Sequence, residues 1–442
     1  MGILAKVGDA LQRLLGKPLA QAAAQDSGVI QRTRRFTPVS LARTFVLGFL
    51  RNPKASDEKL AQMAAQCGAA VTPQAIEQRH TPKLVAFLQK LFQGATQLVV
   101  GSSKALAPIL ERFSRVTVSD SSTIRLPDEL RHEFRGCGGR QDSGAAALKL
   151  QTEWDLRSGA LEQVQVEPGR SPDAATSRQQ VRRGPGSLRI ADLGYFALSV
   201  FAAMAAAGEY FLSRLQFGTQ VWHEDAAVDV LAWLSQQTGP LVDVSVRLGQ
   251  EQRLPCRLLA WRLPPEQANR RRQKLCQEVL RKRGREPSAA RLAWCDWTIL
   301  VTNVPEGLLT AREGAVLYGA RWQVELLFKR WKSQGLVAEL SGSTVVRQMV
   351  RVWSRLLAVV VQHWLTVASV WGDPTKSLHK VSEAVRDFAG HLAATLDCPT
   401  ALEQVLEEMA AAFTKTCRRD KRSKAGTFEL LNDVGLLDFR LT

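Results

Sequence analysis

The sequence predicts a mixed α/β domain flanked by helical regions, and three observations carry this prediction. Apolar residues recur at three- and four-residue spacing over residues 1–112 and again after 310, as in amphipathic helices. Between these regions, residues 146–156 alternate apolar and polar side chains, the period of a strand with one buried face. The chain has 442 residues, which is enough for several domains and a sizeable hydrophobic core.

The charge balance points to a polyanionic partner. The chain has 59 Lys and Arg against 42 Asp and Glu, a formal net charge of +17. More than half of this excess lies before residue 116, and a second block at 270–291 has nine Lys and Arg. Nucleic acid is therefore favoured, although acidic membranes also attract basic proteins.

Cysteine spacing and hydropathy exclude further classes of protein. The seven cysteines are widely spaced and form no Cys-x2-Cys pair, so we expect neither disulfides nor a zinc ribbon, and a reducing, cytoplasmic compartment. The most apolar stretch, 356–371, contains Gln362 and His363 and is too short and polar to span a bilayer. We expect a buried helix there, and no signal peptide or lipid anchor at the first residues.

The N-terminal region contains a pattern typical of a helix-turn-helix. Residues 56–68 and 72–80 predict two short helices around a Gly turn, with Thr72 as N-cap followed by Pro at the first helical position. Gln74, Gln78 and Arg79 would then face a DNA groove. An ordinary helical hairpin explains the pattern equally well.

The central region predicts a mixed sheet. The turn at 157–159 should join strand 146–156 to a strand around 164–166, and the Pro-, Gly-, Ser- and Arg-rich residues 168–186 predict a mobile loop. Strand-like patterns return over 220–310. The other predicted elements are a strand at 116–118, a strand at 188–192, a helix at 195–207 and a strand at 210–217.

The most informative segment is the predicted helix 317–333. At about 100° per residue, Tyr318, Arg321, Glu325, Lys329 and Lys332 fall on one stripe, opposite an apolar face. A solvated face with a Glu-to-Lys pair, worth about 0.3 kcal/mol, is the simpler interpretation. However, one carboxylate among cations and a phenol suits a metal ligand beside bound phosphates.

This stripe resembles the Tyr-x2-Arg-x3-Glu-x6-Lys signature of the DDE transposases of the insertion-sequence-four family, at Tyr318, Arg321, Glu325 and Lys332. The resemblance extends to Val-Thr-Val-Ser-Asp120 and Leu-Arg-Ile-Ala-Asp192, where the family has an Asp at the ends of its first and fourth core strands. Asp142, Glu153 and Asp155 compete for these roles. Asp120 and Asp192 are favoured because each follows an apolar strand.

The resemblance implies a fold class and a domain organisation. The fold is α/β, with a ribonuclease H-like mixed-sheet core at 113–219 and 311–372 and a β-rich insertion at 220–310. Residues 1–112 would form a helical domain that binds the DNA ends. Residues 373–442 would form a helical C-terminal region that could make a dimer contact, with a packed monomeric bundle as the alternative.

The resemblance also implies a mechanism. Asp120, Asp192 and Glu325 would be the catalytic residues and would bind two Mg²⁺ ions, or Mn²⁺. Tyr318, Arg321, Lys329 and Lys332 would hold DNA phosphates. Trp297 would stack on a base flipped from the DNA end, although Trp294 competes for this role and a core position would also explain Trp297.

The expected function is therefore metal-dependent cut-and-paste DNA transposition. It comprises binding of terminal inverted repeats, 3′-end cleavage, a hairpin intermediate and strand transfer into target DNA. The expected partners are double-stranded DNA, as transposon ends and target, and a second copy of the chain, with no membrane; the expected place is the bacterial cytoplasm, at the nucleoid. Two alternatives remain open: a ribonuclease H-like nuclease or resolvase without strand transfer, and a domesticated DNA-binding descendant.

Overall fold

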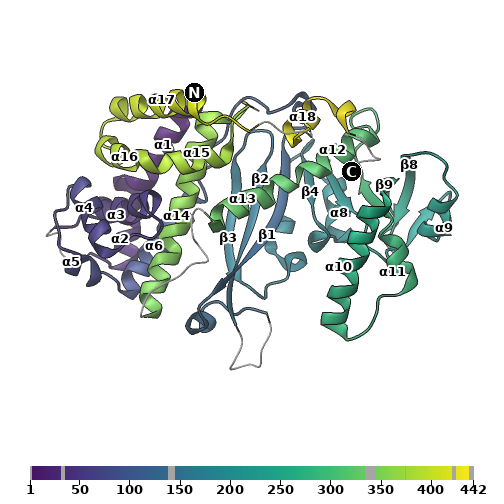
Figure 1. Ribbon diagram of the computed structural model, residues 1–442, viewed down its shortest axis with the longest axis horizontal. Helices are drawn as coiled ribbons and strands as arrows, with labels where there is room; N and C mark the ends of the chain where they lie inside the picture. Colours follow the sequence, from purple (N-terminus) through teal and green to yellow (C-terminus); the bar gives the residue numbers. More distant parts are fainter. Residues whose placement is uncertain are drawn as a thin grey trace. The chain divides into compact units, whose positions relative to one another are not determined.

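The computed structural model describes residues 2–30, 35–137, 145–333, 344–373, 375–420 and 425–437 (Figure 1). The chain forms two compact units, each assembled from three stretches of sequence. The first unit comprises Met1–Leu106, Ser121–Ser171 and Val324–Lys421. The second comprises Ala107–Asp120, Pro172–Gln323 and Arg422–Thr442.

The first unit begins with helices, which confirms the helical character predicted for the N-terminal region. Thr37, Thr72 and Thr81 each accept a backbone hydrogen bond as N-cap and are followed by proline at the first helical position. The helices are α1 (Ile3–Leu15), α2 (Lys17–Ser27), α3 (Pro38–Arg51), α4 (Asp57–Gln66), α5 (Pro73–Glu77) and α6 (Pro82–Ala95).

The predicted helix-turn-helix differs from the observed pair. Helix α5 has five residues and ends at Glu77, because a new N-cap and proline start α6 shortly afterwards. Gln74 and Gln78 are exposed, whereas the Arg79 guanidinium lies over the Phe36 ring, 5.6 Å from its centroid. The second helix is therefore little more than one turn, and a groove-reading role for these residues stays a prediction.

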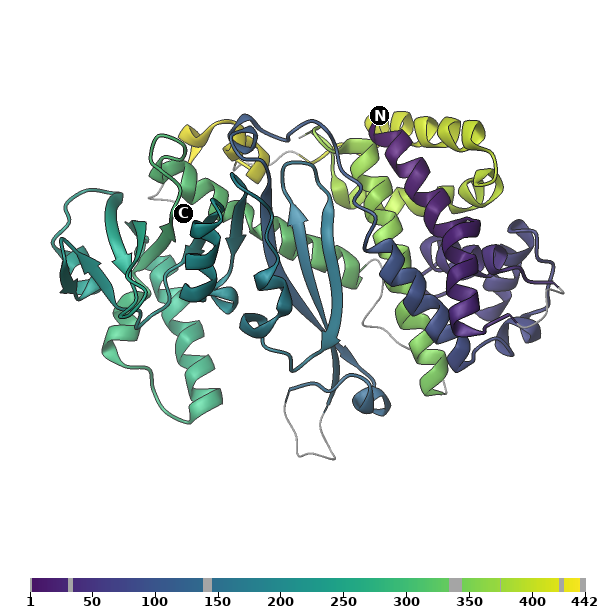
Figure 2. The same ribbon diagram turned by 180° about the vertical axis from the view of Figure 1, so that it is seen from behind.

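Helix α14 (Val345–Val370) is the central element of the first unit. It packs against α3, α6 and α17 (Pro399–Thr416), and it runs beside α1 and α6 in Figure 2. Most of its residues are buried, which confirms the buried helix predicted over 356–371. Within the described parts of the chain, no helix is long and apolar enough to cross a membrane.

The C-terminal helices of the first unit pack against its N-terminal helices. Helix α17 buries its apolar face, including Leu406 and Met409, against α1 and α14. Arg43 makes two hydrogen bonds of 2.7 Å to the Asp397 carboxylate, which joins α3 to the segment after α16. The apolar face of α17 is thus covered by helices of the same unit. A dimer contact through the C-terminal region remains a prediction. The other C-terminal elements are α15 (Leu378–Ala384), the 3₁₀ helix η5 (Val385–Phe388) and α16 (Ala389–Thr395).

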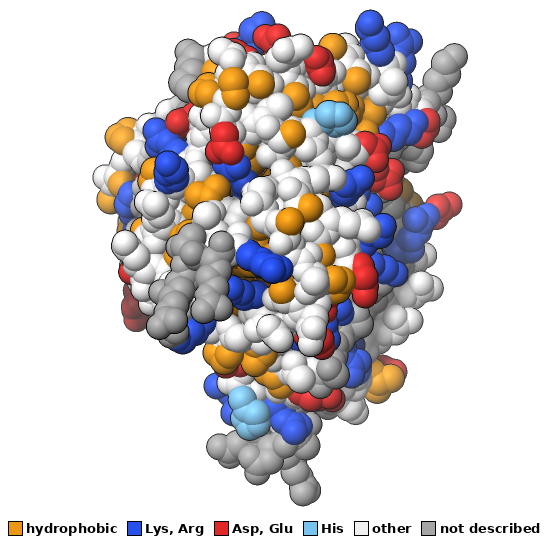
Figure 3. All heavy atoms as spheres, turned by 90° about the vertical axis from the view of Figure 1, so that its left-hand side faces the viewer, with side chains coloured by type: hydrophobic (Ala, Val, Ile, Leu, Met, Phe, Trp, Pro, Cys, Tyr) orange, Lys and Arg blue, Asp and Glu red, His pale blue; other side chains and the backbone are white. Residues whose placement is uncertain are grey.

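The face of the first unit seen in Figure 3 carries mixed charges. Lys and Arg side chains are interspersed there with acidic and uncharged groups, so no single basic patch covers this face. Some cations are paired within the unit: Arg347 contacts Asp57, which also accepts a 3.1 Å hydrogen bond from His80 Nε2. An acid of the N-terminal region is therefore paired with a cation of α14.

The first unit also contains one edge of the sheet, in the order β3-β2-β1. Strands β2 (Ala146–Asp155) and β3 (Leu161–Pro168) form the predicted hairpin. The prediction of one exposed face for β2 is wrong, because all ten of its residues are buried. Two of its polar side chains make hydrogen bonds inside the unit: Lys149 Nζ donates to the Ser171 carbonyl, and Asp155 accepts from the backbone of Arg157 and Ser158.

The β2–β3 turn is anchored to the helices through one carbonyl group. The Gly159 carbonyl accepts from His363 Nε2 at 2.8 Å and from Trp154 Nε1 at 2.9 Å. Gly159 has a φ of +77°, and a Cβ there would lie 2.5 Å from the Trp371 ring. Burial lowers the pKa of His363 to about 4, so this imidazole is neutral at pH 7.

We predict that His363 makes the stability of the protein sensitive to acid. The unfolded chain protonates this residue near its ordinary pKa of about 6.5, whereas the folded chain resists protonation down to about 4. Stability is therefore complete above pH 6.5 and falls as the pH drops toward 4, by at most about 3 kcal/mol. Urea unfolding across this range should show a weaker loss for His363→Gln than for the wild type. His379→Gln, at an exposed position, is the control, and an equal loss in all three proteins would refute the prediction.

The second unit contains the rest of the sheet, in the order β1-β4-β5-β10-β9-β8-β6-β7. Strand β4 pairs parallel with β1 and with β5, and β10 pairs antiparallel with β5 and β9. The strands of the expected insertion thus continue the core sheet, because β10 satisfies the backbone groups along the edge of β5. Their bounds are β1 (Val116–Leu126), β4 (Leu188–Ala191), β5 (Tyr210–Arg214), β6 (Val221–His223), β7 (Ala226–Val228), β8 (Val242–Leu248), β9 (Leu254–Arg262) and β10 (Trp297–Thr302).

The core of the second unit lies between this sheet and α8 (Leu198–Ala206), where the Phe201 and Phe211 rings stack at 4.4 Å. Residues 168–186, predicted as a mobile loop, contain two short 3₁₀ helices. The buried Arg189 on β4 donates to the carbonyls of Gln179, in the second of these helices, and of Val181. The remaining short elements are α7 (Pro108–Glu111), η1 (Asp128–His132, in the first unit), η2 (Asp173–Ala175), η3 (Ser177–Gln180), η4 (Leu193–Tyr195), α9 (Val230–Ser235), α11 (Ala289–Trp294), α18 (Thr427–Asn432) and η6 (Val434–Leu436).

Candidate active site

Two of the predicted acids are neighbours across the sheet. The parallel pairing of β1 with β4 runs to Ser119 opposite Ala191, so Asp120 and Asp192 occupy the next position on each strand. Neighbouring strands lie about 4.8 Å apart, and side chains in register point to the same face. The expectation that β1 ends at Asp120 is wrong, because the strand continues to Leu126, but Asp192 does follow the last residue of β4.

Two residues of the predicted helical stripe contact these carboxylates. Arg321 Nη1 lies 3.1 Å from Asp120 Oδ2, and the two side chains are 14% and 15% exposed. The Tyr318 hydroxyl donates to Asp192 Oδ1 at 3.4 Å. Burial, followed by the charge of Asp192, raises the pKa of Tyr318, so the phenol stays protonated and acts as a donor.

The stripe is carried by two helices rather than one. Helix α12 (Ala311–Ala320) ends before Arg321, which occupies a turn, and α13 (Trp322–Ser333) follows. The single continuous helix predicted over 317–333 is therefore wrong at this residue. The Arg321 guanidinium contacts Asp120 from this turn.

The later residues of the stripe belong to the first unit. Lys332 Nζ donates to the Thr123 carbonyl on β1 at 2.9 Å, and burial lowers the pKa of this amine. Glu325 lies in the first turn of α13 and is partly buried, and Lys329 is exposed. Within the first unit, Lys332 thus contacts the later part of β1.

The pair of acids fits a divalent cation in its chemistry, although two side chains alone make an incomplete site. Carboxylate oxygens are the ligands that Mg²⁺ and Mn²⁺ prefer, and adjacent carboxylates repel each other without a cation. Arg321 supplies one positive charge to Asp120. In the described part of the chain, no three side chains of His, Cys, Asp or Glu gather into a metal site. At least one further oxygen ligand is required.

The three acids that compete with Asp120 and Asp192 for the catalytic roles are Asp142, Glu153 and Asp155. Asp155 closes the β2–β3 turn through its hydrogen bonds to Arg157 and Ser158, and Glu153 is buried along β2. Both lie in the first unit. Asp142 lies outside the described residues.

A cavity of about 360 Å³ in the second unit adjoins Tyr318 and Arg321, and sequence reasoning missed three residues that line it: Arg214, Arg271 and Trp261. Arg271 donates to the Trp297 carbonyl and to Thr298 Oγ1, both at 3.1 Å. Burial and the nearby Arg214 lower the pKa of Arg271 to about 10. Neither arginine forms an ion pair with a described residue, so the cavity is electropositive.

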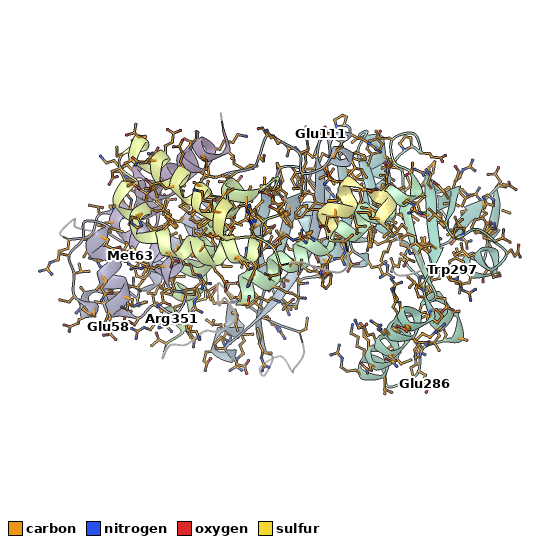
Figure 4. The ribbon with its side chains drawn as sticks, turned by 45° about the horizontal axis from the view of Figure 1, so that its top comes forward. Glu58, Met63, Glu111, Glu286, Trp297 and Arg351 are labelled. Atoms are coloured by element: carbon orange, nitrogen blue, oxygen red, sulfur yellow. The ribbon has the colours of Figure 1, made fainter. Side chains whose placement is uncertain are left out.

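Sequence signals for these cavity residues were weak. Arg271 is one of many cations in the block at 270–291, and Trp261 is one apolar residue in a strand. Trp297, the predicted stacking residue, begins β10 (Figure 4) and packs against the core of the second unit. Trp294 also packs against this core and contacts Phe217 edge-on. The aromatic side chain that lines the cavity with Tyr318 is Trp261.

Comparison with known proteins identifies the family. The family model described as transposase DDE domain matches residues 111–361, more than half of the chain. The chain belongs to this DDE transposase family. Similar proteins include the transposase of insertion sequence element IS231B from Bacillus thuringiensis subsp. berliner, with 27% identity over 79% of this chain and 77% of that protein. The transposase of IS1151 from Clostridium perfringens has 23% identity over 78% and 77% of the two chains.

The match accounts for the architecture around the acids. It covers β1, β4, β5, β10 and the α12–α13 turn, which together position Asp120, Asp192, Tyr318 and Arg321. The mixed sheet with flanking helices is that of a ribonuclease H-like DDE transposase core. Transposases of this family cleave DNA and transfer strands, use divalent metal ions and bind transposon ends.

We predict that Arg321 partly replaces a metal ion when none is bound. Arg321→Ala should lower the free energy of unfolding by about 1–3 kcal/mol, because the largely buried Asp120 carboxylate loses the positive charge of Arg321. Magnesium should then raise the melting temperature of Arg321→Ala more than that of the wild type, because the ion no longer competes with the guanidinium.

Two variants serve as controls for this measurement. Arg112→Ala breaks a different ion pair of the second unit, with Glu313 at 2.8 Å, and should show no magnesium increment beyond the wild type. Adding Asp192→Asn to Arg321→Ala should abolish the increment. The prediction fails if magnesium stabilises Arg321→Ala and the wild type equally.

Proposed function

We propose that this DNA transposase binds the terminal inverted repeats of an insertion sequence and moves the element by metal-dependent cut-and-paste transposition. The observation that carries the proposal is the β1–β4 register, which sets Asp120 and Asp192 side by side. Arg321 and Tyr318, from the signature around Glu325, contact one acid each.

Glu325 is proposed as the third acid. It follows Arg321 by four residues, about one helical turn, and lies in the first turn of α13. Asp120, Asp192 and Glu325 would then hold two Mg²⁺ ions, with Mn²⁺ as a substitute. Bound ions would polarise an attacking water and neutralise the charge that develops on the leaving oxygen.

The surrounding side chains would position the scissile phosphodiester. Arg321, which contacts Asp120, would bring a positive charge beside a phosphate oxygen. Tyr318, which remains protonated, can donate to a phosphate or keep Asp192 in place. Lys332 and the exposed Lys329 would contribute positive charge farther along α13.

The order of reactions is proposed from the family resemblance. Water first frees a 3′-hydroxyl at each transposon end, and that hydroxyl attacks the opposite strand to form a hairpin. A second water opens the hairpin, and the freed end joins target DNA. Trp297 is proposed to stack on a displaced base, and Gln74, Gln78 and Arg79 to contact the end sequence. Two copies of the chain would synapse the two ends.

The proposal predicts that cleavage and end binding can be separated. Asp192→Asn and Glu325→Gln should each reduce cleavage of a transposon-end duplex by at least 1,000-fold, because each removes a charged oxygen ligand. Both variants should bind the same duplex within about threefold of the wild type, because the basic side chains are retained. Gel electrophoresis of cleaved strands and fluorescence anisotropy provide the two readouts.

Glu403→Gln, an exposed isosteric change on α17, is the matched control and should cleave normally. The substrate is the DNA that flanks the coding region, with its inverted repeats. Unchanged cleavage by Glu325→Gln would remove this residue from the active site. Wild-type cleavage without joined products would point to a nuclease instead.

A further inference from the structure

Helix α10 (Pro265–Arg283) is the most strongly charged element of the second unit. It has seven Lys and Arg against two acids, and it projects from the sheet in Figure 1. In Figure 4, Trp297 lies at the sheet side of α10, and Glu286, shortly after the helix, lies near its outer end. The structure divides these cations between two faces.

The inner face of α10 holds the helix against the rest of the second unit. Arg271 donates to the Trp297 carbonyl and Thr298 Oγ1, and Arg272 contacts the Asp296 carboxylate and donates to the Leu292 carbonyl. These contacts fix the start of β10. Ala268 and Val279 are buried on the same side. Arg271 and Arg272 on this face therefore make contacts that stabilise the fold.

The outer face has a different character. Arg270, Lys274, Gln277 and Arg281 follow the spacing i, i+4, i+7 and i+11, which places them on one stripe, and all four are exposed. Lys274 and Arg281 make no hydrogen bond or ion pair with any residue in the described ranges. Arg270 has a 3.4 Å contact with Glu266, but both side chains are more than 70% exposed, so the pair is weak.

We propose that this outer stripe, Arg270, Lys274 and Arg281, binds the phosphate backbone of duplex DNA beside the active site. The inference rests on the proposed function, since it assigns a binding surface to the same DNA. The stripe spans about 16 Å, the length of about five base pairs. It starts one residue from Arg271, which lines the electropositive cavity with Tyr318 and Arg321. DNA held at the acids can therefore continue along α10.

The composition of the stripe favours DNA over an anionic membrane. An interfacial helix buries an apolar face in the lipid, whereas the inner face of α10 is already packed against the protein. The stripe itself is cationic with Gln277 as its uncharged member, and the exposed Leu280 lies to one side. Its contacts should be insensitive to base sequence, because extended Lys and Arg side chains on this spacing would meet phosphates.

Salt dependence of binding tests the proposal. The experiment measures the affinity of Lys274→Gln/Arg281→Gln for the transposon-end duplex and for a random duplex of equal length, between 50 and 300 mM NaCl. The slope of log K against log salt should become shallower by about 2, because each lost phosphate contact removes about 0.9. The loss should be the same for both duplexes.

The matched control removes two charges from the same helix on other faces. Lys282→Gln/Arg283→Gln takes away Lys282, which contacts Glu278, and its exposed neighbour. Its slope should change by less than 1. Equal slope changes in the two double variants, or an unchanged slope in Lys274→Gln/Arg281→Gln, would overturn the proposal, as would a selective loss of binding to phosphatidylserine vesicles. Failure of the wild type to bind either duplex would instead refute the proposed function.

Discussion

The side-by-side placement of Asp120 and Asp192 on parallel strands is the constraint on which the rest of the site depends. Two carboxylates in a partly buried place repel each other, and the cost of leaving them without partners is several kcal/mol. Two residues from one short stretch of the chain offset this repulsion. Tyr318 donates a hydrogen bond to Asp192, and Arg321 forms an ion pair with Asp120. The turn between α12 and α13 lies at Arg321 itself, the residue that contacts Asp120.

Other parts of the second unit support this stretch from two sides. On one side, Arg271 and Arg272 tie α10 to the start of β10, and Arg271 extends the positive potential around Tyr318. On the other, Gln323 Nε2 donates to Thr427 Oγ1 at 2.6 Å, which ties the segment after Arg321 to α18. Basic side chains of α10 therefore serve two purposes, holding the fold on the inner face and presenting charge on the outer face.

Local sequence patterns predicted the elements well, and long-range packing explains where they failed. The alternation in β2 and the apolar strands before Asp120 and Asp192 correctly predicted strands. Of the residues that the helical spacing set on one stripe, Tyr318 and Arg321 each contact one of these acids, whereas Lys332 contacts the Thr123 carbonyl. The contacts with DNA phosphates expected of all three stay predictions. The full burial of β2, the turn at Arg321 and the continuation of the sheet through β10 depend on partners far away in sequence. Arg214, Arg271 and Trp261 were missed for the same reason, because a single Arg or Trp in a strand or basic run carries no local signal.

The most direct test of the central claim is to map which parts of the chain surround the metal ion. Iron(II) bound in place of Mg²⁺ generates hydroxyl radicals with ascorbate and peroxide, and these cut the backbone close to the ion. The account predicts three sets of cuts, near Asp120, Asp192 and Glu325, that disappear together when excess Mg²⁺ is added. Cuts near Asp120 and Asp192 without cuts near Glu325, or cuts that Mg²⁺ does not suppress, would contradict it.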